Sequence, residues 1–326
     1  MSDIAVAGGR TARRGRLETG TRAAGRARDT RRVLQLALAA IWLLDAALQY
    51  QPFMYSKAFG QSLAAAAAGD PGIIASPVTW DAALVEQHAV LLNTIFATTQ
   101  LLLAIGIAYR PTIRLALGAS IAWATGVWWF GEGLGGVLTG DASPVSGAPG
   151  AVILDALLAV LLWPADRDGE PAPFTAARAI GTRPAQALWL VLWLSLAYFA
   201  LQPASRAPQA LSGMLSDMGS GEPRWLAAID RDAAALAAGR GLAASIALAV
   251  ALALVAAGIY LPRPAVKAAL VLAIAVAAAI WVFGEALGAI FTGSGTDPNS
   301  GPLLALLALA YWPARTAQPN AELPPA

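Results

Sequence analysis

The chain carries nearly the same stretch twice: residues 127–140 read VWWFGEGLGGVLTG and residues 280–293 read IWVFGEALGAIFTG, with no gap between the copies. Each copy ends an apolar run with a glutamate, Glu132 in the first and Glu285 in the second. Ionisable groups at membrane depth are costly and usually face a protein interior or a wet cavity. The repeat therefore predicts two equivalent, sheltered carboxylates.

The composition is that of a membrane protein. Hydrophobic residues make up 57% of the chain and charged residues 13%, whereas roughly a quarter of the residues of a soluble domain are charged. The absence of cysteine excludes disulfides, thiolate zinc sites and cysteine-held iron–sulfur clusters. The single histidine, His88, cannot form a bis-histidine haem site within one chain. Electron transfer would therefore require a diffusible carrier, such as a quinone, or a redox partner subunit.

Apolar runs predict the membrane topology. A helix of roughly 20 residues crosses the hydrocarbon core, and further matches, such as Trp163-Pro164 with Trp312-Pro313, indicate that a whole unit was duplicated. We expect an all-α, polytopic membrane protein with about eight transmembrane helices in two parallel four-helix repeats. The runs lie near 33–50, 88–109, 112–133, 186–203, 241–261 and 265–290, with shorter ones near 150–163 and 301–313.

The same pattern predicts the domain organisation. The expected segments are an Arg-rich disordered tail (1–32), a first repeat (33–165), a linker (166–185), a second repeat (186–315) and a short tail (316–326). Arginines gather in the tail and in the short loops on one side, while the loops 134–150 and 286–300 hold neither lysine nor arginine. The positive-inside rule then places both termini in the cytoplasm of a bacterial cell, with the plasma membrane as the location. The lipid bilayer is the expected partner, and nucleic acid is not, because topology already explains the basic tail.

Two polar loops precede the short apolar runs, which are too short to cross the bilayer alone. Irregular backbone at that depth must be buried in protein or line water. We therefore expect two outward-facing vestibules, each with a glutamate, tryptophans and a threonine-glycine turn. Longer outer segments, 51–86 and 202–239, are expected to be short helices that form a lid, or else plain surface loops. The candidate ligand- or proton-binding residues of the vestibules are Glu132, Glu285, Trp128, Trp281, Thr139, Thr292, Asp141 and Asp297.

Each of these residues also has a structural interpretation. The glutamates could accept hydrogen bonds from neighbouring loop amides, or bind protons if they are buried without a positive partner. Trp128 and Trp281 could form an interfacial belt or stack on a quinone. The glycines around each glutamate could serve close helix packing or ligand access.

Two further candidates lie on the outer face. His88 could shuttle protons or simply be a satisfied residue at a helix end. Arg240, opposite Glu86 across the expected pseudo-two-fold axis, could form an ion pair between the halves.

The first helix, LALAAIWLLDAALQYQPF, and the hairpin LLLAIGIAYRPTIRLALGASIAW resemble the DoxX and DoxD-like four-helix membrane proteins, and the chain looks like two such units fused. The resemblance implies a membrane subunit linked to sulfur or thiol oxidation, with a quinone as electron acceptor. The arginine turns at Arg110 and Arg263 fit the pattern; the tandem arrangement and the duplicated FGExLG motif depart from it.

The sequence thus leaves three functional hypotheses. The first is a quinone-associated or accessory subunit of an envelope redox system for sulfur or thiol oxidation. The second is a small-solute or proton-coupled carrier that uses Glu132 and Glu285. The third is a non-catalytic structural membrane partner. No nucleophile elbow, phosphate loop or metal-ligand spacing is present, so the sequence does not decide whether the chain is an enzyme.

Overall fold

A computed structural model of the chain describes residues 30–165, 172–218 and 221–314. Every secondary-structure element named in these ranges is helical, which confirms the all-α prediction. Residues 1–29 of the expected N-terminal tail, residues 166–171 of the expected linker, and Arg315 with the expected C-terminal tail (316–326) lie outside the described residues.

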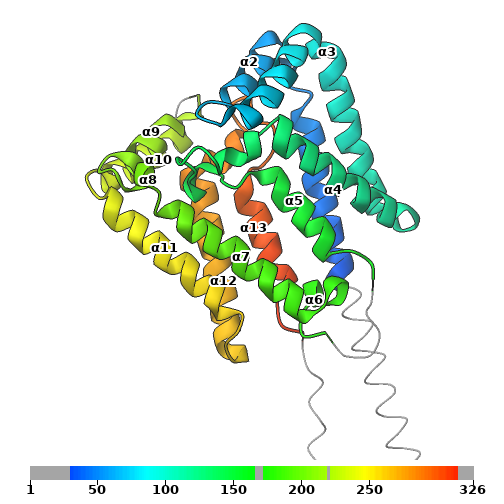
Figure 1. Ribbon diagram of the computed structural model, residues 1–326, viewed down its shortest axis with the longest axis vertical. Coiled ribbons are helices and arrows are strands. Elements are labelled where there is room, and N and C mark those ends of the chain that lie inside the picture. Colours follow the sequence, from blue (N-terminus) through cyan, green and yellow to red (C-terminus); the bar gives the residue numbers. More distant parts are fainter. Residues whose placement is uncertain (1–29, 166–171, 219–220, 315–326) are drawn as a thin grey trace, which may run out of the picture.

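The first half begins with a helix over residues 30–48, drawn in dark blue in Figure 1. Short helices follow, and then the long α3, whose end forms a tight hairpin with α4 through the Arg110 turn. The elements are η1 (Pro52–Tyr55), α2 (Lys57–Ala65), α3 (Gly72–Ala108), η2 (Arg110–Thr112), α4 (Ile113–Phe130), η3 (Gly133–Gly136), η4 (Pro144–Ser146) and α5 (Ala151–Leu161).

The second half contains a comparable series of helices with more breaks. The expected linker contains a short helix, α6, and the first residues of α7. The elements are α6 (Thr175–Ile180), α7 (Thr182–Ala200), α8 (Pro203–Arg206), α9 (Ala210–Met218), α10 (Arg224–Ala237), α11 (Gly241–Gly258), α12 (Arg263–Ala279), η5 (Ile280–Gly284), η6 (Ala286–Ala289) and α13 (Ser300–Ala310).

Three helices of the described residues are long and apolar enough to cross a membrane: α3, α11, and α12 continued through η5 to Gly284. Two shorter apolar helices, α5 and α13, lie near the positions predicted for the short runs. Of the roughly eight expected spans, three are thus supported by helix length and composition.

The longest helix, α3, has a kink at His88, where the backbone angles (φ −130°, ψ 36°) leave the helical region. The kink falls where the sequence predicts the change from outer segment to membrane helix. The part before it packs against α2 at the top of Figure 1. In the second half, the corresponding outer segment is divided into α8, α9 and α10 (Figure 1).

The two short helices, α5 and α13, pack against each other at the centre of the molecule (Figure 1). A buried aromatic cluster fixes α13 against α7. The Trp189 ring lies 4.7 Å from the Tyr311 ring, and the Tyr311 hydroxyl donates a hydrogen bond of 2.6 Å to the Ala185 carbonyl. Trp189 Nε1 donates to the Val255 carbonyl of α11 at 3.0 Å, so the polar atoms of both Trp189 and Tyr311 have partners.

The duplicated motif forms a left-handed turn in both halves. Residues 133–136 have φ of 55°, 56°, 64° and 67°, and residues 286–289 have 45°, 58°, 76° and 53°. In the first copy three of the four residues are glycine, so those glycines serve backbone conformation and not only the helix packing predicted from sequence. In the second copy Ala286, Leu287 and Ala289 adopt the same conformation, although it costs a non-glycine residue about 1–2 kcal/mol. The fold therefore requires this turn.

Exchanging glycine and alanine at corresponding positions of the two turns tests this requirement. A Cβ at Gly136 would meet only Thr139 atoms at 3.8 Å, so Gly136→Ala adds backbone strain without a clash. We expect Gly136→Ala to lower the free energy of unfolding by about 1–2 kcal/mol, and Ala289→Gly to raise it by up to about 1 kcal/mol. Reversible SDS titration in mixed micelles measures both changes.

Gly213→Ala is the matched control, because Gly213 lies in α9 with open space around it and no positive φ. Alanine is the better helix former by about 1 kcal/mol, so this variant should lose no stability. A stability loss at Ala289→Gly equal to that at Gly136→Ala would contradict a role for backbone strain.

Candidate functional site

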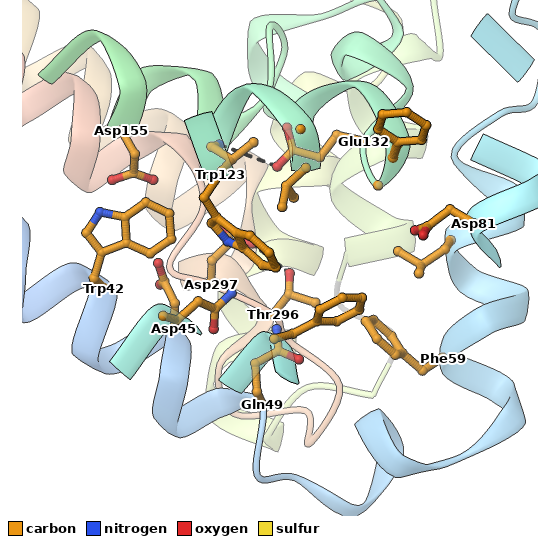
Figure 2. A pocket seen from close by; sticks show the side chains of 18 of the residues that line it. Trp42, Asp45, Gln49, Phe59, Asp81, Trp123, Glu132, Asp155, Thr296 and Asp297 are labelled. Carbon is orange, nitrogen blue, oxygen red and sulfur yellow. Dashed lines mark hydrogen bonds between the residues drawn. The ribbon is translucent and has the colours of Figure 1, made fainter. Parts of the chain in front are cut away.

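A cavity of about 450 Å³, here called cavity 1, lies in the first half of the chain (Figure 2). It is enclosed by the helix over residues 30–48, by α2, α3, α4 and α5, and by the loop before α13. Its polar lining consists of carboxyl and amide groups, and its apolar lining is mostly aromatic. The principal residues are Trp42, Asp45, Gln49, Phe59, Trp80, Asp81, Phe96, Gln100, Trp123, Phe130, Glu132, Asp155, Thr296 and Asp297.

Carboxyl groups without partners define the chemistry of cavity 1. Asp45 and Asp155 are each 3% exposed, and one oxygen of each, Oδ1, is buried without a hydrogen bond. Glu132 Oε2 is likewise buried and unpartnered. Asp45 lies close enough to Asp155, Asp297 and Glu132 for mutual electrostatic repulsion. No lysine, arginine or histidine occurs among the described residues that line the cavity, so these residues offer the carboxyls no positive partner.

The second half of the chain contributes Asp297 to this site. Gln51 Nε2, from the end of the first helical region, donates to the Gly295 carbonyl at 3.0 Å and so holds the loop in place. Within the loop, Asp297 accepts hydrogen bonds from the Thr296 hydroxyl (2.6 Å) and the Asn299 N–H (2.7 Å). Burial raises the pKa of Asp297, and these two hydrogen bonds oppose the rise. The site is therefore assembled only when both halves are folded together.

Aromatic rings form the rest of the wall. Trp42 is 1% exposed, and its indole Nε1 is buried without a partner, as is that of Trp123. Trp123 packs edge-on against Phe96 at 5.8 Å, and Trp80 against Phe130 at 6.5 Å. In Figure 2, Trp42 and Trp123 lie among Asp45, Asp155 and Asp297, while Asp81 and Phe59 lie on the opposite side. The cavity thus combines unpaired acidic oxygens, unpaired indole N–H groups and ring faces.

The two repeat-related glutamates have different surroundings. Glu132 accepts one long hydrogen bond, 3.4 Å from the Val152 N–H near the start of α5, drawn as a dashed line in Figure 2. Glu285 is 2% exposed and accepts hydrogen bonds from the Ser300 N–H (3.2 Å), the Gly301 N–H (3.0 Å) and the Ser300 hydroxyl. Both carboxyls face the N-terminus of the following short helix. Glu285 has the contacts of a structural cap, whereas Glu132 keeps one oxygen free beside cavity 1.

The second half replaces the acidic residues by leucine. Counted from the shared Trp-Pro pairs, Asp155 corresponds to Leu304; counted from Trp42 and Trp193, Asp45 corresponds to Leu196. Leu196 and Leu304 are 0% and 1% exposed, so leucine packs well at these places in the fold. The fold itself therefore does not need a carboxyl group at either position.

A second cavity of about 570 Å³, cavity 2, lies at the corresponding place in the second half. Val276 lines it where Trp123 lines cavity 1, and Ala200 corresponds to Gln49. Ser143 and Val145, from the loop of the first half, reach into it, as Thr296 and Asp297 reach into cavity 1. The two halves thus exchange loops, but cavity 2 is mainly aliphatic.

The tryptophans and threonines predicted from the motif are mostly engaged in local structure. Trp128 Nε1 donates to the Pro149 carbonyl at 2.6 Å. Trp281 packs against Gly301, where a Cβ would lie 2.2 Å from the tryptophan Cβ. The hydroxyls of Thr139 and Thr292 donate to the carbonyls of Gly136 and Ala289 at 2.8 and 2.7 Å, closing equivalent turns.

The other predicted candidates lie away from cavity 1. Asp141 and His88 are exposed. Arg240 lines cavity 2 and donates to the Leu236 carbonyl at 2.9 Å, while Glu86 accepts a hydrogen bond from Gln61. Of the predicted set, cavity 1 brings together Glu132 and Asp297.

Sequence reasoning missed most of the cavity lining. Asp155 is the only charged residue of the apolar helix α5, and that isolation was an available signal. Asp45 was visible as the residue that differs from Leu196, but nothing in the sequence placed it beside Glu132. Asp81, Trp42 and Trp123 carried no signal that separates them from lipid-facing or outer-segment residues.

The carboxyl groups do not form a compact metal site. Among the described residues, no three or more Asp, Glu, His or Cys side chains are grouped so that they could hold a metal ion. Comparison with known proteins gave no matching family model, curated protein or solved structure. The resemblance to DoxX and DoxD-like proteins therefore stays a prediction.

Truncating each glutamate tests the difference between the two motif copies. Glu285→Ala leaves donors at the start of α13 without their acceptor, and we expect it to lower the free energy of unfolding by about 1–3 kcal/mol. Glu132→Ala removes one long hydrogen bond and a largely unpaired carboxyl, so it should change stability by less than about 1 kcal/mol. SDS titration in mixed micelles measures both variants. Equal losses at the two positions would contradict different roles.

Proposed function

We propose that this chain is a proton-coupled carrier of a small solute, with cavity 1 as its binding site. The observation that carries the proposal is the set of unpartnered carboxyl oxygens of Asp45, Asp155 and Glu132 around one cavity. Several carboxylates confined together without a cation repel each other, which favours proton uptake by some of them. A cavity that has exchangeable protons and room for a ligand is suited to coupling solute movement to proton movement.

The energetics of burial support a functional role for these carboxyls. Burying a charged group without a partner costs several kcal/mol, and replacing it by a well-packed apolar residue is often neutral or stabilising. Leu196 and Leu304 occupy the corresponding places in the second half. Retention of Asp45 and Asp155 therefore costs stability, as is common for residues kept for activity.

The membrane arrangement is part of the proposal. Helices α3, α11 and α12 are candidate spans, and we propose that the 30–48 helix, α4, α7 and the short helices α5 and α13 complete about eight spans in two parallel repeats. With both termini on the cytoplasmic side of a bacterial plasma membrane, the arginine turns at Arg110 and Arg263 face the cytoplasm. Cavity 1 would then open toward the outer face, beside α2.

Proton movement in proteoliposomes tests the carrier. Liposomes with an internal pH-sensitive dye are given neutral, anionic and cationic small solutes in turn. We expect one solute class to change the internal pH with the wild-type protein. Glu132→Gln should reduce the rate of this pH change at least about tenfold, because an amide side chain does not take up or release a proton near neutral pH.

Asp232→Asn is the matched control, because Asp232 is an exposed carboxyl on α10. It should retain the wild-type rate. If no solute class moves protons with the wild-type protein, the proposal is wrong.

Leucine substitutions separate function from stability. Asp45→Leu and Asp155→Leu copy the residues of the second half, and we expect each to raise the free energy of unfolding by about 1–4 kcal/mol while abolishing proton coupling. SDS titration and the liposome assay are run on the same preparations. A leucine variant that is less stable than wild type would show that the carboxyl is structural.

A quinone-associated role in an envelope redox system is the second candidate. The unpartnered indole N–H groups of Trp42 and Trp123 could donate hydrogen bonds to quinone carbonyls in an aromatic cavity. Absence of solute-driven proton movement with the wild-type protein, together with quinone binding that is lost in Trp123→Val, would favour this candidate. A non-catalytic structural role is favoured if neither solute-driven proton movement nor quinone binding is found.

A further inference from the structure

We propose that the solute of cavity 1 is a small organic cation, an ammonium group attached to an apolar body, which exchanges for protons on the carboxyl groups. This inference rests on the carrier function proposed above and names its substrate class. It stands on three features of the cavity: its charge, its ring faces and its size.

The first feature is charge. Five carboxyl groups line cavity 1 from every side: Asp45 on the helix over residues 30–48, Asp81 on α3, Glu132 after α4, Asp155 on α5 and Asp297 before α13. No basic side chain lies among the described lining residues. Asp45 and Asp155, both more than nine-tenths buried, each present an oxygen without any partner. An ammonium group supplies both the missing charge and the N–H donors that these oxygens lack.

The second feature is the aromatic wall. A cation over the face of a tryptophan, tyrosine or phenylalanine ring is attracted by the ring quadrupole, most strongly by tryptophan. Cavity 1 is lined by Trp42, Trp80 and Trp123, together with Phe59, Phe96 and Phe130. Figure 2 shows Trp42 and Trp123 close to the carboxyls of Asp45, Asp155 and Asp297. Carboxylates interleaved with ring faces are the recognition chemistry of amines and quaternary ammonium groups.

The third feature is size. A volume of about 450 Å³ is within the range of small-molecule sites, roughly 300–1,000 Å³. The acidic groups are distributed around this volume, and among the described residues they form no cluster that could hold a metal ion. A bare ion would reach only part of the lining. A polyatomic cation can contact carboxylates at one end and rings along its body.

Cavity 2 provides an internal comparison. It is slightly larger than cavity 1, and Val276 lines it where Trp123 lines cavity 1. Leu196 and Leu304, the counterparts of Asp45 and Asp155, are buried in the second half. Asp45, Asp155 and Trp123 are thus replaced in the second half, whereas Trp42, Phe130 and Glu132 have the counterparts Trp193, Phe283 and Glu285. The replaced residues are two unpartnered carboxyls and one ring of cavity 1, as expected if these three recognise a ligand that cavity 2 does not bind.

Cation binding implies proton release. When an ammonium group binds beside a protonated carboxyl, the O–H bond of that carboxyl breaks, the proton leaves to solvent and the carboxylate pairs with the cation. Charge in the cavity is then unchanged, which avoids both an unpaired carboxylate and an excess positive charge. The carrier would accordingly move organic cations in exchange for protons.

Calorimetric titration of the full chain in detergent micelles at neutral pH tests the substrate class. The probes are benzylamine, which is protonated at that pH, tetramethylammonium, and benzyl alcohol as the neutral counterpart. We expect at least one cationic probe to bind at least about tenfold more tightly than benzyl alcohol. Its apparent binding enthalpy should vary with the ionisation enthalpy of the buffer, because protons are released.

Two variants locate the binding site. Asp45→Asn keeps the side-chain shape, and Trp123→Val copies Val276, which the fold already accepts in the second half. Each should weaken cation binding at least about tenfold. Asp232→Asn and Trp225→Leu, at exposed positions on α10, are the matched controls and should bind as wild type does.

The outcomes separate this inference from the carrier function. If neither cation binds more tightly than benzyl alcohol while another solute class drives proton movement in liposomes, the substrate class is wrong and the carrier function stands. If a cation binds with proton release but no solute moves protons across liposomes, the chain is a cation-binding protein and not a carrier. Equal binding of cation and neutral probe by wild type and by Asp45→Asn would overturn the inference.

Discussion

The structure depends on how two short helices begin inside the protein. The first turn of a helix leaves backbone N–H groups without intrahelical partners, and α5 and α13 start next to a carboxyl supplied by the preceding helix. Glu285 accepts hydrogen bonds from the first two N–H groups of α13, and Glu132 faces α5 in the same way with one long bond. A carboxylate at this end is also favoured by the helix dipole. The duplicated glutamate thus provides an acceptor for backbone N–H groups at the start of each short helix.

The left-handed turn after each glutamate connects the glutamate to the loop that leads to the short helix. After each glutamate the chain must reverse sharply, and the strained conformation at 133–136 and 286–289 provides the reversal. Beside it, loops cross between the halves: Asp297 lines cavity 1, and Val145 lines cavity 2. A loop of each half therefore completes the wall of the cavity in the other half. Carboxyls line cavity 1, and mainly aliphatic residues line cavity 2.

The proposed exchange of cations for protons uses Glu132, which makes fewer hydrogen bonds to its helix than Glu285 does. Three hydrogen bonds leave Glu285 little freedom, whereas Glu132 keeps an unpartnered oxygen near Asp45, Asp155 and Asp297. Unpaired buried acids cost stability, and the corresponding positions of the second half hold the buried leucines Leu196 and Leu304. Organic cations would supply the charge and donors that these acids lack, and ring faces would hold the rest of the ligand.

The sequence by itself determined the all-helical class, the duplicated motif and most helix positions, because apolar runs and their breaks depend only on local order along the chain. It also predicted Glu132 and Asp297 as candidate residues, and both line cavity 1. It could not distinguish Glu132 from Glu285, since the two motif copies are nearly identical and the difference lies in the loops and helices that pack around each carboxyl. Nor could it bring Asp45, Asp155 and Trp123 to one cavity. That grouping comes from long-range packing of helices and from the loop exchanged between the halves, which only the tertiary structure decides.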